Sequence, residues 1–103
     1  TVMLHKKSMA EVKELTSFFV AIREDPRIGT THISLYMALF QFFNLNGLQN
    51  PVSITRAGVM KVAKIDGLAT YHKCMKDLSD FGYIQYLPSY NPAISSQVFL
   101  LKV

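Results

Sequence analysis

The sequence predicts a single α+β domain that is mostly helical. Four stretches repeat apolar residues at helical spacing. Near the C-terminus, "YIQYL" and "QVFLLKV" read instead as two strands around the loop Pro88–Ser96. The chain has 103 residues, of which 50% are hydrophobic, so its length and apolar content suit one packed domain.

Composition and charge indicate which class of partner and which cellular compartment to expect. The net charge of +4 favours a polyanionic partner. The single Cys74 has no partner for an internal disulfide, which fits a reducing cytoplasm. The stretch "TVMLHKK" lacks the apolar core of a secretory signal, and the apolar run Ile33–Phe43 is much shorter than the roughly 20 residues of a membrane span. We therefore expect a cytoplasmic protein without a membrane segment.

The first helix is expected over Ser8–Glu24. Ser8 and Glu11 have the spacing of a capping box, and Asp25-Pro26 ends the helix because proline disfavours helical geometry in the residue before it. One apolar stripe follows at helical spacing. It consists of Met9, Val12, Leu15, Phe19 and Ile22.

The second helix is expected after Gly29–Thr31 and runs to about Leu45. Its apolar residues lie nearly all round the axis, so other parts of the protein must cover it on several sides. Gly47 is a candidate C-terminal stop. After Pro51, the residues Val52–Ile54 have the character of one short strand.

The third helix is expected over about Arg56–Ala63, with Thr55 as its N-cap. Gly58 is unfavourable in its first turn by about 1 kcal/mol relative to alanine. The residues expected to point inward are Val59, Met60 and Val62.

A compact turn, Lys64–Gly67, leads to the fourth helix, for which Asp66 is a candidate N-cap. This helix, Gly67–Phe81, has one apolar face and is closed by Gly82. The residues expected to be buried are Tyr71, Met75 or Cys74, Leu78 and Phe81. The opposite face is mostly cationic and rich in hydrogen-bonding groups.

This order of elements resembles the winged helix-turn-helix family of DNA-binding domains over Thr31–Val103. The most specific feature is Met75-x-x-Leu78-x-x-x-Gly82-Tyr83-Ile84. Its two apolar positions seat the helix on the core, Gly82 supplies a left-handed turn, and Ile84 returns the chain to the core. The resemblance implies a winged helix-turn-helix, with a three-helix core and a β-hairpin wing, preceded by an extra N-terminal helix.

The resemblance also implies a DNA-binding surface, with Gly67–Phe81 as the recognition helix in the major groove. The implied base-reading residues are Ala69, Thr70, His72, Lys73 and Lys76. The implied phosphate contacts are Thr55, Arg56, Lys61 and Lys64. Segment 56–76 holds five of the 11 Lys and Arg residues against one acid, Asp66, a surplus of four that equals the net charge of the chain.

The implied wing departs from the pattern of the family, because Pro88–Ser96 carries no Lys or Arg at its tip. Its hydrogen-bonding residues are Ser89, Tyr90, Asn91, Ser95 and Ser96. They could reach phosphates, yet insertion of a cation into the minor groove is not expected. We therefore expect a weaker wing contribution than is usual in this family.

The resemblance divides the chain into residues 1–30, a dimerisation helix, and residues 31–103, the DNA-binding domain. The apolar stripe of the first helix is the implied homodimer interface, as in many bacterial winged-helix regulators. A two-fold dimer would place two recognition helices about one DNA turn apart. The whole chain also resembles small regulators carried on mobile elements of Bacteroides-type bacteria, which implies gene control or element maintenance.

Other interpretations of the same residues are simpler. The Lys/His face could be an ordinary solvated helix face. His72 and Cys74 lie on different faces of a helix, and His5 and His32 are distant in sequence, so a zinc site is not expected. Asp77 and Asp80 are expected to solvate the last turns of their helix rather than to form a catalytic pair. We expect no enzyme activity and no cofactor, and the sequence indicates no effector ligand.

These observations favour a homodimeric protein that binds specific double-stranded DNA sequences and regulates transcription. The alternative is a winged-helix protein–protein adaptor, or an accessory factor in replication or excision of a mobile element. The uncharged wing and the surplus apolar residues support that alternative. Sequence alone does not separate these roles, because they share one surface.

Overall fold

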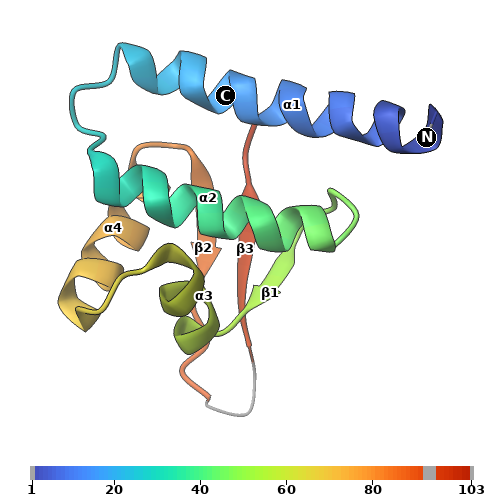
Figure 1. Cartoon of the computed structure of the whole chain (residues 1–103). Helices are drawn as coiled ribbons and strands as arrows, with labels where there is room; N and C mark the ends of the chain where they lie inside the picture. The colour runs from blue at the N-terminus through green and yellow to red at the C-terminus, as the bar shows by residue number, and fades with distance from the viewer. Residues whose placement is uncertain (1, 92–94, 103) are drawn as a thin grey trace.

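The computed structural model of the chain describes residues 2–91 and 95–102, with side chains described from Lys13 onward. The elements in this part are α1 (Val2–Arg23), α2 (Thr30–Leu45), β1 (Val52–Ile54), α3 (Arg56–Ala63), α4 (Leu68–Asp80), β2 (Ile84–Leu87) and β3 (Ser96–Leu100). The predicted α+β class and the predicted order of helices and strands are confirmed (Figure 1).

The three strands form one antiparallel sheet in the order β1-β3-β2. The last strand is therefore central, and its Val98 pairs with Val52 on one side and Tyr86 on the other. The Asn50 side chain fixes this arrangement at the start of β1. Its amide group donates to the Leu100 carbonyl at 2.8 Å, and its carbonyl accepts from the Leu100 N–H at 2.9 Å.

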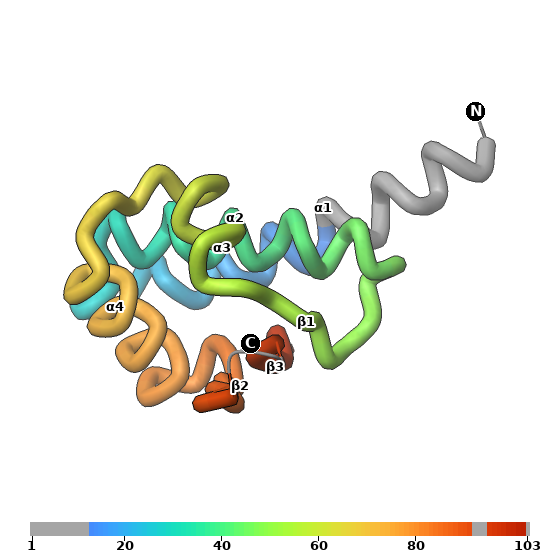
Figure 2. Tube along the Cα trace, turned by 90° about the horizontal axis from the view of Figure 1, so that it is seen from below, coloured from blue at the N-terminus to red at the C-terminus, as the bar shows by residue number. Residues whose placement is uncertain are grey.

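Helix α2 forms the centre of the core. It lies between α1 on one side and the α3–α4 pair on the other, and it also packs against β1 and β3 (Figures 1 and 2). Its buried residues are Leu35, Tyr36, Ala38, Leu39, Phe40 and Phe43. The expectation that this apolar helix is covered on several sides is confirmed.

Helix α1 begins earlier than predicted. It starts at Val2, so Ser8 and Glu11 lie inside the helix and the predicted capping box does not mark its start. The physical reason is that the preceding residues include good helix formers, among them Leu4, Lys6 and Lys7, which extend the helix toward the N-terminus.

The inward residue of α1 is Phe18, which the predicted stripe left out. Phe18 is fully buried and stacks on Tyr36 with ring centroids 3.6 Å apart. Its neighbour Phe19 is 42% exposed. Leu15 and Ile22 of the predicted stripe pack against the core of the same chain. The side chains of Met9 and Val12 lie outside the described residues.

A polar cluster ties the α1–α2 loop to the turn after α4. Arg27 donates to both carboxylate oxygens of Asp25 at 2.8 Å, and the Tyr83 hydroxyl donates to Asp25 Oδ2 at 2.6 Å. The Arg27 guanidinium also lies over the Phe81 ring, 4.0 Å from its centroid. These bonds hold the pKa of Asp25 well below its ordinary range, with Arg27 the largest cause and Tyr83 the next.

The turns around α3 and α4 were predicted in part. Thr55 caps α3, and Gly82 adopts a left-handed φ of +88° after α4, as expected. Two predictions were wrong. Val62 is 47% exposed while Ala63 is buried in its place. Gly67, and not Asp66, is the N-cap residue of α4, and its cap has no side-chain hydrogen bond.

In the part of the chain that the structure describes, none of the helices combines the length and the apolarity that crossing a bilayer requires.

Candidate nucleic-acid interface

One face of α4 is exposed and carries all five residues predicted to read bases. Ala69, Thr70, His72, Lys73 and Lys76 are exposed, whereas Tyr71, Cys74, Met75 and Leu78 are buried. The predicted division of this helix is therefore confirmed. The packing of Tyr71, Met75 and Leu78 on the core holds the exposed face in one orientation.

The two lysines of this face are paired within the helix. Lys73 Nζ lies 2.8 Å from Asp77 Oδ2, and Lys76 Nζ lies 2.5 Å from Asp80 Oδ2, each at i, i+4. These carboxylates raise the pKa of both ammonium groups. Segment 56–80 thus carries five cations and three acids, a surplus of two charges, because Asp77 and Asp80 lie just beyond the segment used for the predicted surplus of four.

Asp77 does more than solvate the end of α4. His32 Nδ1 accepts from the Gly29 N–H at 3.0 Å, so Nε2 carries the hydrogen that Asp77 Oδ2 accepts at 2.8 Å. The bond to Lys73 is the largest cause, and the bond to His32 the next, of a lowered pKa at Asp77. The pair fixes α4 to the start of α2, although the two residues are 45 positions apart.

Helix α3 presents the residues predicted to contact phosphates. Thr55 Oγ1 accepts from the Gly58 N–H at 3.1 Å and so satisfies a free donor of the first turn. Arg56, Lys61 and Lys64 are exposed, and none of them makes an ion pair with the side chains that the structure describes, those of residues 13–91 and 95–102. The Ser34 hydroxyl donates to the Ala63 carbonyl, which ties the end of α3 to α2.

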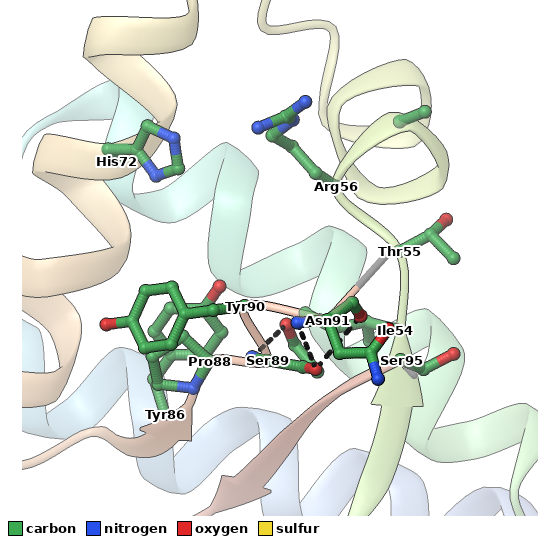
Figure 3. A pocket seen from close by; sticks show the side chains of 12 residues that line it. Ile54, Thr55, Arg56, His72, Tyr86, Pro88, Ser89, Tyr90, Asn91 and Ser95 are labelled. Carbon is green, nitrogen blue, oxygen red and sulfur yellow. Dashed lines mark hydrogen bonds between the residues drawn. The ribbon is translucent and has the colours of Figure 1, made fainter. Parts of the chain in front are cut away.

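A hollow of about 640 Å³ lies between the start of α3, the middle of α4 and the β2–β3 hairpin. Figure 3 shows Arg56 and His72 on one side of it, with Tyr86, Tyr90 and the hairpin on the other. Its lining consists of Ile54, Thr55, Arg56, Ala57, His72, Tyr86, Pro88, Ser89, Tyr90, Asn91, Ser95 and Ser96. The hollow therefore joins residues from all three predicted sets: base-reading, phosphate-contacting and wing.

The hairpin side of the hollow is organised by two serines. The Ser89 N–H donates to Ser96 Oγ at 3.1 Å, and the Ser89 hydroxyl donates to the Asn91 carbonyl at 3.2 Å. Tyr90 is 92% exposed. The predicted loop also spans residues 92–94, which lie outside the described residues.

The hollow does not gather every predicted residue, and it includes some that the sequence did not suggest. Lys61, Lys64, Lys73 and Lys76 are absent from its lining. Tyr86 was predicted only as a strand residue. The available sequence signal was an aromatic residue near the end of an alternating segment, and the structure shows that it is half-buried. Among the described residues, no three His, Cys, Asp or Glu side chains are grouped so that they could hold a metal ion.

The chain matches none of the protein-family models, curated proteins or solved structures with which it was compared.

Proposed function

We propose that this protein is a winged helix-turn-helix that binds specific sequences of double-stranded DNA as a transcriptional regulator. The observation that carries this proposal is that His72 of the exposed face of α4, the start of α3 and the β2–β3 hairpin converge on one concave surface. Two features of the fold support it. The pairing of β1 with the last strand and the short connection from α3 to α4 are the arrangement expected of this class.

The proposed roles follow the chemistry of the exposed side chains. Helix α4 has 13 residues, and an α-helix with its side chains is about 10–12 Å across, which fits a major groove roughly 12 Å wide. Thr70, His72 and Lys73 would meet base edges. Arg56 and Lys61, which have no ion pair among the described residues, would neutralise phosphates.

The proposal includes a homodimer formed through the outer face of α1. Leu15 and Ile22 pack on the core of their own chain, so among the side chains of α1 that the structure describes the exposed Phe19 and Val20 are the large apolar residues left to meet a second copy. A two-fold dimer would pair two copies of α4 with a palindromic site.

Selection of bound duplexes from a random pool, followed by affinity measurements at several salt concentrations, tests this function. Lys73→Ala and His72→Ala should each weaken the selected site by about 1–3 kcal/mol, with little effect on unrelated duplexes. Lys61→Ala should weaken all duplexes alike and lower the salt slope by about 0.9, since it removes one phosphate contact. Unchanged binding of the selected site by Lys73→Ala would refute the assigned reading face.

The ion pairs within α4 favour a second candidate, a winged-helix adaptor that binds protein, for instance in replication or excision of a mobile element. Lys73 and Lys76 are already paired with carboxylates, and the hairpin residues that the structure describes carry no charge. Such a surface attracts polyanions less strongly than unpaired lysines would.

Asp80→Asn separates the two candidates, because it frees Lys76 without removing a cation. A DNA-binding protein should then bind duplexes more tightly and elute later from heparin. An adaptor should elute early from heparin both before and after this change.

A further inference from the structure

The hollow beside His72 has more room than a phosphate contact needs. Its volume of about 640 Å³ falls within the roughly 300–1,000 Å³ that is usual for small-molecule sites. Neither aspartate nor glutamate occurs among the described residues that line it. The hollow therefore suits an anion that also carries a sizeable uncharged group.

Arg56 and His72 supply the side that would hold the anion. Figure 3 shows both residues on the same side of the hollow, opposite Tyr86 and Tyr90, and a guanidinium offers several N–H donors in a planar fork that matches phosphate. The His72 ring packs edge-on against Tyr71, with centroids 5.4 Å apart and planes at 66°, which limits its orientations.

The surroundings of Tyr71 link the cationic side to the aromatic side. Burial, with a smaller contribution from Tyr86, raises the pKa of Tyr71 to about 12, and Arg56 acts in the opposite direction. Arg56 and Tyr86 both line the hollow. The cation and the ring of Tyr86 therefore belong to one site.

Tyr90 supplies a flat surface on the hairpin side. Its side chain is 92% exposed, an unusual position for a large aromatic residue. The bonds from Ser89 to Ser96 and Asn91 hold the backbone on either side of it. An exposed ring beside a cation is the combination that binds a nucleobase and its phosphate.

We propose that this hollow binds a single nucleotide, with its phosphate between Arg56 and His72 and its base against Tyr90. The site goes beyond duplex recognition, because the bases of a duplex are stacked on each other and their faces are not available to Tyr90. The nucleotide can come from two sources, a free mononucleotide or the unpaired end of a DNA strand.

Calorimetric titration with adenosine 5′-monophosphate, ribose 5-phosphate and adenosine tests the site on the full chain. Adenosine 5′-monophosphate should bind at least roughly tenfold more tightly than either fragment, the size expected of one stacking contact or one charge-assisted contact. Equal affinity for adenosine 5′-monophosphate and ribose 5-phosphate would overturn the proposed role of the base.

Three variants locate the binding, each checked for an unchanged thermal transition. Arg56→Gln should weaken both adenosine 5′-monophosphate and ribose 5-phosphate, whereas Tyr90→Leu should weaken only the nucleotide. The matched control is Arg23→Gln, which removes an exposed arginine of α1 outside the hollow and should leave nucleotide binding unchanged. If Arg23→Gln weakened nucleotide binding as much as Arg56→Gln, the binding would be general charge attraction and the site would be rejected.

A comparison of DNA ends distinguishes the two sources. A duplex with a single-stranded overhang that binds more tightly than a blunt duplex of the same sequence would assign the site to strand ends. Tight binding of free adenosine 5′-monophosphate, with no preference for the overhang over the blunt duplex, would assign the site to a free nucleotide. Nucleotide binding without any duplex binding would refute the proposed function and leave this site standing. Duplex binding without any binding of the nucleotide and without preference for the overhang would refute this site and leave the proposed function standing.

Discussion

Two partly buried aspartates act as joints between distant segments. Asp25 binds Arg27 beside it and Tyr83, which is 58 positions away. Asp77 binds Lys73 one turn earlier and His32, which is 45 positions away. Each carboxylate thus has one local partner and one from another element. Both joints end near α4, so they fix the position of the proposed reading helix.

The bonds of Asp25 should make the free energy of unfolding depend on pH in the acidic range. The pKa of Asp25 is lowered in the folded state, chiefly by Arg27, so its contribution is fully present above the ordinary carboxyl pKa of about 3.9. That contribution is lost as the pH falls below this value toward the lower folded-state pKa. In Asp25→Asn this loss is absent.

Urea unfolding of the wild type and Asp25→Asn between pH 2 and pH 6 measures this effect. The difference in unfolding free energy between the two proteins should be greatest near pH 6 and should shrink toward pH 2. A difference that stays constant over this range would contradict the role given to Asp25.

At the scale of elements, α3 shows how a residue with poor helix propensity can be required by the geometry of a helix cap. Gly58 sits in the first turn, where its N–H donates to Thr55 Oγ1. A Cβ built on Gly58 would lie 2.9 Å from that same oxygen, closer than real Cβ atoms come. The cap and the glycine therefore depend on each other, and this explains a residue that is unfavourable by propensity alone.

A double-mutant cycle tests this dependence. Alanine for glycine inside a helix normally stabilises by about 1 kcal/mol, but Gly58→Ala should forfeit that gain because Thr55 must move and weaken its cap. In a Thr55→Ala background, Gly58→Ala should stabilise by about 1 kcal/mol, since no cap remains to be lost. Chemical unfolding of the four proteins gives the coupling. Additive effects would show that the close approach has no energetic consequence.

At the scale of the whole molecule, α1 has two different faces. Its inner face completes the core through Phe18, which also meets the Tyr83 ring edge-on with centroids 5.6 Å apart. Its outer face leaves Phe19 and Val20 exposed. Deleting residues 1–26 would remove both faces at once and uncover Tyr36, so single substitutions are a cleaner test of the proposed dimer.

Phe18 and Phe19 form a matched pair for that test. Phe18→Ala should cost about 3–5 kcal/mol of stability, because it empties a fully buried site. Phe19→Glu should leave the unfolding transition nearly unchanged and shift a dimer toward monomer in sedimentation experiments. A wild-type monomer, or a Phe19→Glu protein that remains a full dimer, would refute the proposed interface.

Much of the fold could be predicted from sequence patterns that span only a few residues. The cap at Thr55, the left-handed turn at Gly82 and the apolar face of α4 each depend on residues within one or two turns, so they could be predicted. The pairing of Lys73 with Asp77 was also readable, because i, i+4 neighbours meet on a helix. The predicted surplus of four charges covered only residues 56–76, so it left out Asp77.

By itself, the sequence determined the α+β class, the order of the elements and the exposed face of α4, because hydrogen bonding and apolar periodicity act over a few residues. Only the tertiary structure decided that Phe18 and not Phe19 enters the core. It also brought Arg56, His72 and Tyr90 around one hollow. Such juxtapositions depend on how whole helices and the sheet pack together, and no local spacing encodes the contacts that result.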